Sequence, residues 1–437
     1  MRAEGRPRTF RLAFGAIVIA LVAIVSGCGR TTMTTIRIGV LADCESSVFA
    51  SDFERVIAGA ELPLLRRGAQ LRGSRPSAGV TSATVAGKRV ELVVGCVREF
   101  SRASTLAALR LLVEQKKVDV VVGPMGPADG LVVRDYAKRE PGVAFVYAGF
   151  DGAVTLIAPA PNVFRFRVTM AQWGAGLGAY AYHELGWRTA VTIGNIEPGP
   201  VGFIAEFCSL GGKIVKRLWQ GGNDLGALAA DIPKTGVDGV FLPTSLYDTE
   251  SFVAAWAKRH PDLGRWLVAG DGILTVGLTK GRTDERLLGV VASNPTPWAP
   301  THAWTSFATE FSRAFPAIGD NLQDPLDPYD ATEAVLEALE QVHGDLSHGE
   351  LRLMHALARL RFDSPEGPRR LDSHHQAIGV IYLGKMVRGK NGKLTVRQVR
   401  VVPNVDQTFG GYFSGTTPAV SRTQPACKRG HVPSWAR

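Results

Sequence analysis

One segment, residues 118–127, restricts the fold most strongly because it combines a buried strand with an abrupt stop. It opens with Val-Asp-Val-Val-Val, a β-branched run without polar alternation that predicts a strand covered on both faces, as in parallel sheets between helices. The Gly-Pro pair at 123–124 ends this strand. The loop that follows lies at the strand's carboxyl end, where open α/β sheets bind ligands, so Met125, Gly126 and Pro127 are candidate contacts for a small molecule. The alternative is an ordinary turn between a strand and a helix.

The same alternation of strand and helix continues on both sides of this segment. The first series has expected strands at 36–41, 90–94 and 143–149 and expected helices at 51–65, 104–116 and 131–139. The second series has strands at 189–193, 213–218, 237–242 and 266–269 and helices at 173–185, 202–210 and 249–259. Residues 288–293 are interpreted as a crossing strand, 329–342 as a helix that packs back on the first lobe, and 376–386 with 393–401 as a hairpin. The fold class is therefore α/β, with two doubly wound parallel-sheet lobes.

Length and charge agree with this organisation. A chain of 437 residues is long enough for two lobes of roughly 150 to 200 residues each. Its formal net charge of +10 falls to about +7 without the amino-terminal segment, and the remaining Lys and Arg are scattered. No basic helix or aromatic-interleaved stripe is present, so we expect no nucleic-acid partner.

The amino terminus is predicted to be a targeting segment. Arg2, Arg6, Arg8 and Arg11 precede an apolar core, residues 13–25, that is short for a membrane span. The sequence Val25-Ser26-Gly27-Cys28 resembles the bacterial lipobox, in which the Cys is lipidated and becomes the new amino terminus. The resemblance implies an extracytoplasmic protein that is lipid-anchored to the bacterial cell membrane through Cys28. The alternative is an uncleaved signal anchor with an incidental Cys.

Four cysteines remain after Cys28, and outside the cytoplasm they can pair. Cys44 and Cys96 each follow an expected strand, and neighbouring parallel strands would bring the two sulfurs together, which predicts a disulfide. Cys208 and Cys427 could form a second bridge, although nothing in the sequence places the tail.

The usual signatures of enzymes and metal sites are missing from the sequence. There is no Gly-x-Ser-x-Gly elbow, no His-Glu-x-x-His and no Walker loop. His374 and His375 would point to opposite faces of a strand, and His348 and His355 are almost two helical turns apart, so surface histidines are favoured over a metal site. We expect no enzyme activity, no cofactor and no bound metal.

Several short motifs, taken in order, are similar to those of the type 1 periplasmic binding proteins, specifically the branched-chain amino-acid-type substrate-binding lipoproteins of ABC transporters. The motifs are Ile36-Arg37-Ile38-Gly39-Val40, Val121-Val122-Gly123-Pro124, Asn162-Val163-Phe164-Arg165, Leu210-Gly211-Gly212-Lys213-Ile214-Val215, Gly270-Asp271-Gly272, Tyr329-Asp330-Ala331 and Phe362-Asp363-Ser364-Pro365-Glu366-Gly367-Pro368. The resemblance implies two α/β lobes joined by three crossovers, with a ligand in the cleft between them. On this basis the segments are 1–27 signal peptide, 28–35 anchor linker, 36–160 with 292–358 as lobe 1, 161–291 with 359–405 as lobe 2, and 406–437 as a carboxyl-terminal tail.

The resemblance also implies the positions of the ligand contacts. In lobe 1 they fall in two loops, at Met125, Gly126 and Pro127 and at Ala148, Gly149 and Phe150. Relatives usually have Ser or Thr hydroxyls in these loops for a ligand carboxylate, and here those hydroxyls are missing. Backbone amides at helix amino termini are one substitute, and a less polar ligand, an amide or a ligand without a carboxylate is another possibility.

In lobe 2 the implied contacts are Glu197, Tyr247 and Asp271. Asp271 falls where relatives have an acid that pairs with the ligand's ammonium, and a desolvated ammonium needs such a partner. Its alternative role is that of a turn residue, and Tyr247 is alternatively a packing aromatic.

The resemblance implies a substrate-binding protein whose partners are a small-molecule ligand, an ABC permease and the membrane. The ligand is expected to be an amino acid or a related amide, bound by hinge closure of the lobes. Two alternatives keep the fold and change the role: a ligand-sensing lipoprotein that delivers no cargo to a permease, and a scaffold that binds no small ligand.

Overall fold

The computed structural model describes residues 34–437 apart from 45–51, 99–100, 150, 195–198, 221–224, 243–248, 271, 275–283 and 320–321. Residues 34–437 form one compact unit. Within the described part of this unit, no helix is long and apolar enough to span a membrane.

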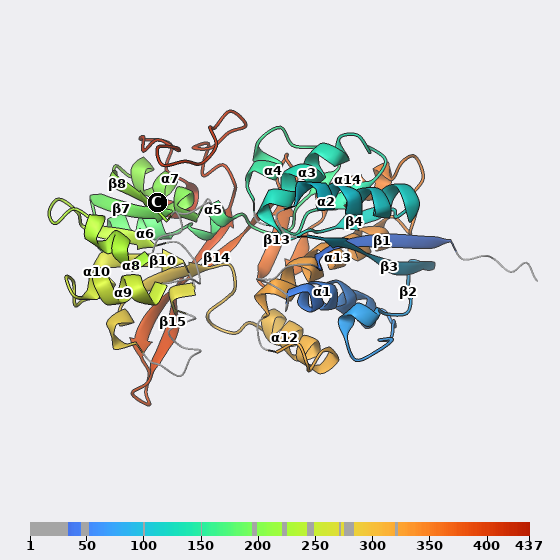
Figure 1. Cartoon of the computed structure of the whole chain (residues 1–437), viewed down its shortest axis with the longest axis horizontal. Coiled ribbons are helices and arrows are strands. Elements are labelled where there is room, and N and C mark those ends of the chain that lie inside the picture. The colour runs from blue at the N-terminus through green and yellow to red at the C-terminus, as the bar shows by residue number, and fades with distance from the viewer. Residues whose placement is uncertain are drawn as a thin grey trace, which may run out of the picture. The chain divides into compact units, whose positions relative to one another are not determined.

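The first sheet has the strand order β2-β3-β1-β4-β5-β6, and all its pairings are parallel except β2 with β3 (Figure 1). Its strands are β1 (Thr35–Asp43), β2 (Ala83–Val85), β3 (Lys88–Val97), β4 (Val120–Val122), β5 (Ala144–Val146) and β6 (Val163–Phe164). The helices of this region are α1 (Asp52–Arg66), α2 (Arg102–Arg110) with a π-helical turn at Leu111–Gln115, α3 (Pro127–Ala137), α4 (Ala153–Leu156), α12 (His302–Ala314), α13 (Gln323–Gln341) and α14 (Leu351–Arg359).

The central strand β4 is buried on both faces, as its sequence predicts. Val120 and Val122 belong to a core cluster shared with α13 and α14, whereas Val121 belongs to a second cluster shared with α2 and α3. Each of the three valines is fully buried, so successive residues of the strand face opposite layers of helices.

The second sheet has the order β12-β13-β14-β11-β10-β9-β7-β8, with β15 paired to β14. Its strands are β7 (Thr189–Gly194), β8 (Lys213–Trp219), β9 (Gly239–Leu242), β10 (Leu267–Gly270), β11 (Val291–Asn294), β12 (Phe362–Ser364), β13 (Gly367–Leu371), β14 (Ala377–Arg388) and β15 (Leu394–Val405). The helices of this region are α5 (Met170–Trp173), α6 (Leu177–His183), α7 (Gly199–Ser209), α8 (Leu225–Leu228), α9 (Thr249–Ala257) and α10 (Leu263–Trp266). Short 3-10 turns lie at Pro76–Ala78, Ala229–Asp231, Glu285–Leu287 and Ser434–Ala436. The two lobes, one with a mainly parallel and one with a mixed sheet, confirm the expected α/β class.

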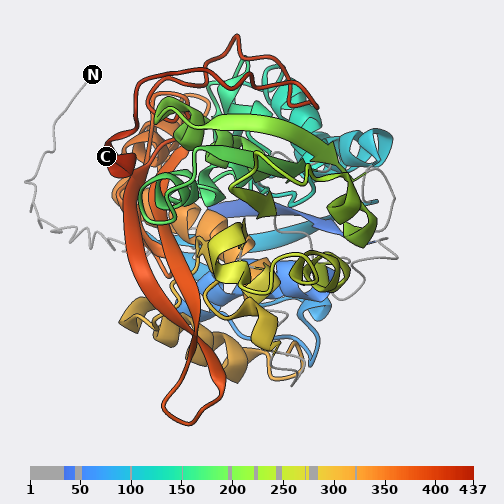
Figure 2. The ribbon, with the colours of Figure 1, turned by 90° about the vertical axis from the view of Figure 1, so that its left-hand side faces the viewer.

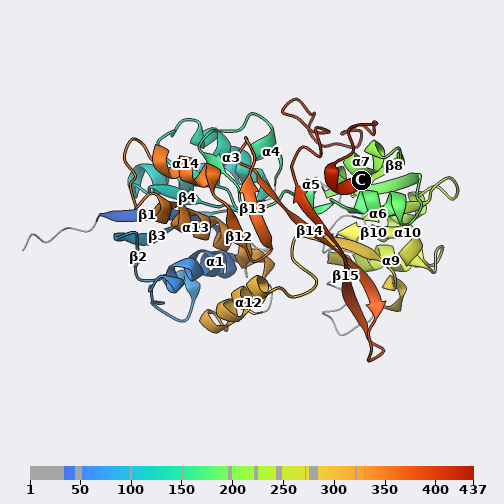
Figure 3. The same ribbon diagram turned by 180° about the vertical axis from the view of Figure 1, so that it is seen from behind.

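The chain passes between the two groups of elements after β6, after β11 and after α14 (Figure 3). The third passage runs through the short hairpin of β12 and β13 into β14. From there the long ribbon of β14 and β15, drawn in orange and red, forms the hairpin that the sequence indicates (Figure 2).

Two helices differ from their predicted extents. The helix expected over 173–185 is split into α5 and α6, because Gly176 has a φ of +84° and donates its N–H to the buried carboxylate of Glu206, 2.7 Å away. Helix α13 begins at Gln323, well before residue 329, although Pro328 lies inside it. Pro328 packs closely against Gly59 of α1, and this tertiary contact outweighs the helix-breaking tendency of proline.

Both cysteine pairs are disulfide-bonded. Strands β1 and β3 are parallel neighbours with Ala42 opposite Cys96, and the Cα atoms of Cys44 and Cys96 are 5.2 Å apart. This confirms the predicted bridge. Cys208 of α7 is bonded to Cys427, with Cα atoms 5.4 Å apart, and this bridge attaches the carboxyl-terminal tail to α7.

Candidate functional site

The first predicted ligand loop follows β4 directly. Gly123 has a φ of +92°, its peptide bond to Pro124 is cis, and its N–H donates to the carbonyl of Val146 in β5 at 3.0 Å. Gly126 is the N-cap residue of α3. The loop thus passes from a buried strand to a helix amino terminus, where backbone N–H groups can donate hydrogen bonds to an anionic or polar ligand group.

The second predicted loop, after β5, packs against the first. The Tyr147 hydroxyl donates to the carbonyl of Gly126 at 3.1 Å. A Cβ atom on Gly149 would lie 2.2 Å from the Tyr147 hydroxyl oxygen and 2.7 Å from the carbonyl oxygen of Met125, so only glycine fits at this position. Ala148 and Gly149 are buried, whereas Met125 is partly exposed. The structure therefore brings Met125, Gly126, Ala148 and Gly149 together at the carboxyl edge of the sheet.

Arg165 belongs to the motif Asn162-Val163-Phe164-Arg165, but the sequence alone indicates no role for it. In the structure its side chain holds the continuation of the second loop in place. Its guanidinium is completely buried and donates to the Asp151 carbonyl, to the Gln376 side chain, and to the Thr155 hydroxyl at 2.7 Å. Burial lowers the pKa of Arg165 to about 10, partly opposed by Tyr147 and Asp151, so the group is still cationic at neutral pH. A buried positive charge therefore lies beside the segment that follows β5.

The other predicted contacts lie outside the described residues. These are Phe150 in lobe 1, Glu197, Tyr247 and Asp271 in lobe 2, and the predicted lipidation site Cys28; the side chain of Pro127 is not described either. The strands that precede the three lobe 2 residues are β7, β9 and β10, which are parallel and consecutive in the sheet. Their carboxyl ends therefore meet at one edge of the second sheet.

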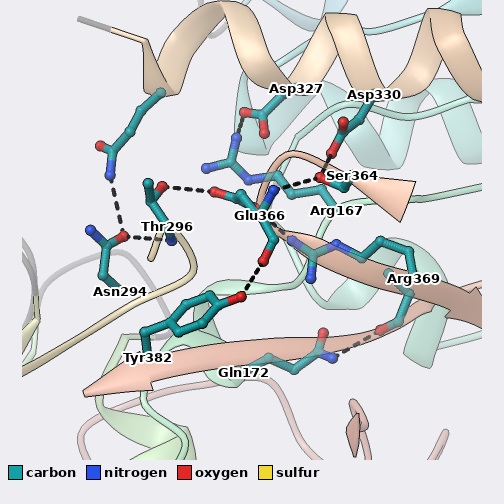
Figure 4. A network of polar contacts seen from close by, with 12 residues as sticks. Arg167, Gln172, Asn294, Thr296, Asp327, Asp330, Ser364, Glu366, Arg369 and Tyr382 are labelled. Carbon is teal, nitrogen blue, oxygen red and sulfur yellow. Dashed lines mark hydrogen bonds and ion pairs between the residues drawn. The ribbon is translucent and has the colours of Figure 1, made fainter. Parts of the chain in front are cut away.

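A buried polar network joins the places where the chain passes between the sheets (Figure 4). Glu366, in the third passage, accepts hydrogen bonds from Thr296 Oγ1 of the second passage at 2.9 Å and from Arg369 Nη2 at 2.6 Å. The Tyr382 hydroxyl donates to the Glu366 carbonyl at 2.7 Å. One carboxylate thus connects two of the three passages.

The first passage joins the same network through Arg167, whose guanidinium forms an ion pair with Asp327 of α13 (Figure 4). The neighbouring acid, Asp330, is bonded to the Ser364 hydroxyl at 2.6 Å. Burial raises the pKa of Asp330 to about 8 against the opposing effect of Arg369. Polar or charged groups from all three passages are therefore buried together.

Among the described residues, no three His, Cys, Asp or Glu side chains are grouped closely enough to hold a metal ion. The ring of His375, one of the histidines considered above, stacks on Phe164 with centroids 4.4 Å apart.

Comparison with known proteins identifies the family. The chain matches the sequence profile of the family described as "Periplasmic binding protein" over residues 35–393. It is a periplasmic binding protein. The match extends through both sheets up to the turn before β15, and the family is one of binding proteins and not of enzymes.

Solved structures agree on the type 1 fold of this periplasmic binding protein. A substrate-binding protein of an ABC transporter from Sphaerobacter thermophilus has a TM-score of 0.71 and 22% identity, covering 85% of this chain and 99% of its own. A solute-binding protein from Rhodopseudomonas palustris BisB5, in complex with 3,4-dihydroxybenzoic acid, has a TM-score of 0.67 and 20% identity, covering 85% and 98%. A leucine-binding protein from Thermotoga maritima has a TM-score of 0.62 and 19% identity, covering 84% and 98%. A search among proteins of curated function found no significant match.

Proposed function

We propose that the chain is the lipid-anchored substrate-binding component of an ABC importer and that it closes its two lobes on a small ligand. The observation that carries this proposal is the packing of the two lobe 1 loops, at Met125 and at Gly149, against each other at the carboxyl edge of the first sheet. Lipidation at Cys28 holds the protein outside the cytoplasm, at the membrane that contains its permease partner. The proposed lobe boundaries are close to 36–160 with 292–358 and 161–291 with 359–405, between the anchor and the tail, with β6 included in the first lobe and β11 in the second.

The ligand is an amino acid or a related amide, held in lobe 1 by backbone groups. Met125, Gly126, Ala148 and Gly149 have no side-chain hydroxyls, so the amino terminus of α3 supplies the hydrogen-bond donors for a carboxylate or amide oxygen. Asp271 would pair with the ligand's ammonium.

An aromatic carboxylate is the second candidate ligand. The loops of lobe 1 are less polar than those expected for an amino acid, and one similar structure holds 3,4-dihydroxybenzoic acid. A ligand of this kind would not need Asp271, because it carries no ammonium group. The dependence of binding on Asp271 therefore separates the two classes.

Closure is proposed to occur about the three passages that share the buried polar network. Binding energy from contacts to both lobes shifts the population toward the closed form, which the permease recognises. Two alternative roles keep the fold and need no permease: a sensor would use the same cleft without delivering cargo, and a scaffold would bind no small ligand.

A thermal-melt screen of the protein from residue 29 onward, against amino acids, small amides and benzoates, tests this proposal. A ligand at a hundred times its dissociation constant should stabilise the protein by about 2.7 kcal/mol. Met125→Arg, which places a long cation in the loop, should remove the shift, whereas the matched change Val399→Arg on an exposed position of β15 should keep it. Asp271→Ala should remove the shift only for an aminated ligand. If no compound shifts the melt, or if Met125→Arg responds like wild type, the proposed site is wrong.

A further inference from the structure

A cavity of about 320 Å³ lies in lobe 1 between α1, the strands β1 and β3, and the segment 72–80. Its lining mixes polar and apolar side chains, and the apolar ones come from all of these elements: Val40, Ile57, Ala60, Val80, Leu92 and Val94. The 3-10 turn at 76–78 closes one side and is attached to α1, because Ser77 donates its N–H and its hydroxyl to the Glu54 carboxylate at 2.8 and 2.6 Å.

A single carboxyl group, that of Glu61, is buried in the wall of this cavity. Glu61 follows Ile57 by four residues on α1 and so shares its inward face. The residue is only 1% exposed, and its Oε2 atom has no hydrogen-bond partner among the described residues. An acid in this position requires either a proton or a positively charged partner.

The charged groups around Glu61 do not provide that partner. Glu54, on the same helix, is negative and is occupied by Ser77, and Glu91 of β3 is paired with Arg89 at 2.8 Å. The Arg72 side chain, on the segment over the cavity, is exposed.

Among the described residues, no charged residue of the neighbouring helix α13 lines the cavity. Glu333 and Glu340 are paired with Arg67 and do not line the cavity. Burial and, to a smaller extent, Glu54 raise the pKa of Glu61 to about 8.

We propose that this cavity binds a small protonated amine with an aliphatic body, whose ammonium group pairs with Glu61. The ammonium supplies up to three hydrogen-bond donors and the missing positive charge, and the aliphatic part packs against the apolar side chains of the lining. A divalent metal fits poorly, because it needs several oxygen ligands and Glu61 is the single buried carboxylate that the described residues contribute to the cavity.

This site is separate from the ligand cleft and goes beyond the proposed transport function. The two regions still share a wall: Val40, Ile57 and Ala60 belong to a small core cluster against which Met125 of the first ligand loop packs. An amine bound beside Glu61 would therefore be one side chain away from that loop.

Isothermal titration of the protein from residue 29 onward with n-butylammonium chloride tests the proposal. Because the cation binds ionised Glu61, the dissociation constant should fall about tenfold or more between pH 6.5 and 8.5. At pH 7 the reaction should release a proton from Glu61, measured as a dependence of the binding heat on the ionisation enthalpy of the buffer. Neutral 1-butanol, which has the same aliphatic body, should bind much more weakly.

Single substitutions test whether the amine binds at Glu61. Glu61→Gln keeps the shape of the side chain and should abolish the titration heat, whereas the matched change Glu184→Gln, in an exposed ion pair, should leave the heat unchanged. Asp271→Ala should also leave it unchanged, which separates this site from an amine bound in the cleft. The proposal is overturned if wild type gives no heat, if no proton is released, or if Glu61→Gln binds butylammonium like wild type.

Discussion

Helices α1 and α7 each carry a glutamate on a buried face, and the surroundings of the two carboxylates are opposite. Glu206 of α7 accepts hydrogen bonds from the N–H groups of Gly176 and Gly178, at 2.7 and 3.1 Å, and from the indole N–H of Trp435 at 2.6 Å. Glu61 of α1 has an oxygen without any partner among the described residues and lies beside a cavity.

This difference distinguishes a buried carboxylate with a purely structural role from one that lacks hydrogen-bond donors. Glu206 caps the amino-terminal turn of α6 and holds the end of the chain, so its role is complete within the fold. Burial raises the pKa of both acids, Glu206 to about 7 and Glu61 to about 8, but only for Glu206 do hydrogen bonds oppose that effect. A buried carboxyl group that accepts no hydrogen bond within the fold is therefore the better indicator of a ligand-binding site.

The largest loss of stability is expected from removing the disulfide between α7 and the tail. Cys208→Ala with Cys427→Ala removes a bridge that spans 219 residues, which should lower the free energy of unfolding by about 5 kcal/mol on chain entropy. The matched pair Cys44→Ala with Cys96→Ala, which spans 52 residues, should cost about 4 kcal/mol. Urea unfolding without reductant measures both. A loss below about 1 kcal/mol for the first pair would show that the tail contributes little to the fold.

A smaller loss of stability is expected from replacing Glu206. Glu206→Ala leaves three or more buried N–H donors without an acceptor, which should cost about 3 kcal/mol in urea unfolding. Glu206→Gln keeps one acceptor oxygen and should cost less, and Trp435→Phe removes a single donor and should cost about 1 kcal/mol. Stability within 1 kcal/mol of wild type for Glu206→Ala would contradict the contrast between the two helices.

At pH 5, where Glu61 is protonated in the folded protein, the smallest effect of the three is expected for Glu61→Gln, and the substitution should also change the pH dependence of stability. The folded protein holds the Glu61 proton more tightly than the unfolded chain, so the stability of wild type is fully present below pH 4.5 and declines as the pH rises toward 8. The decline relative to Glu61→Gln should not exceed about 1.4 kcal/mol per pH unit. Urea unfolding of both proteins at pH 5 and pH 8, without added amine, measures it. Equal pH dependence in the two proteins would show that Glu61 is not desolvated.

The sequence predicted those features that depend on local pattern and strand order. The valine run of β4, the loop after it and the bridge between Cys44 and Cys96 follow from periodicity and from the register of parallel neighbours. The loop after β5 was placed by the family resemblance. The position of Glu61 was also open to prediction, since it follows Ile57 by four residues on an otherwise apolar helix face.

Features that depend on partners distant in the sequence could not be predicted. Arg165 and Gln376 are 211 residues apart, and Glu206 and Trp435 are 229 apart, so no local pattern joins them. The break before α6 requires the carboxylate of Glu206, which the sequence around Gly176 does not reveal. In lobe 2, Glu197, Tyr247 and Asp271 remain predictions.

Small-angle X-ray scattering measures the proposed closure most directly. The protein from residue 29 onward would be titrated with the compound that most raises its melting temperature. We expect the radius of gyration to fall and to reach its limit at one ligand per chain, with no change for Met125→Arg. A bound ligand that leaves the scattering curve unchanged would contradict closure of the two lobes on a substrate.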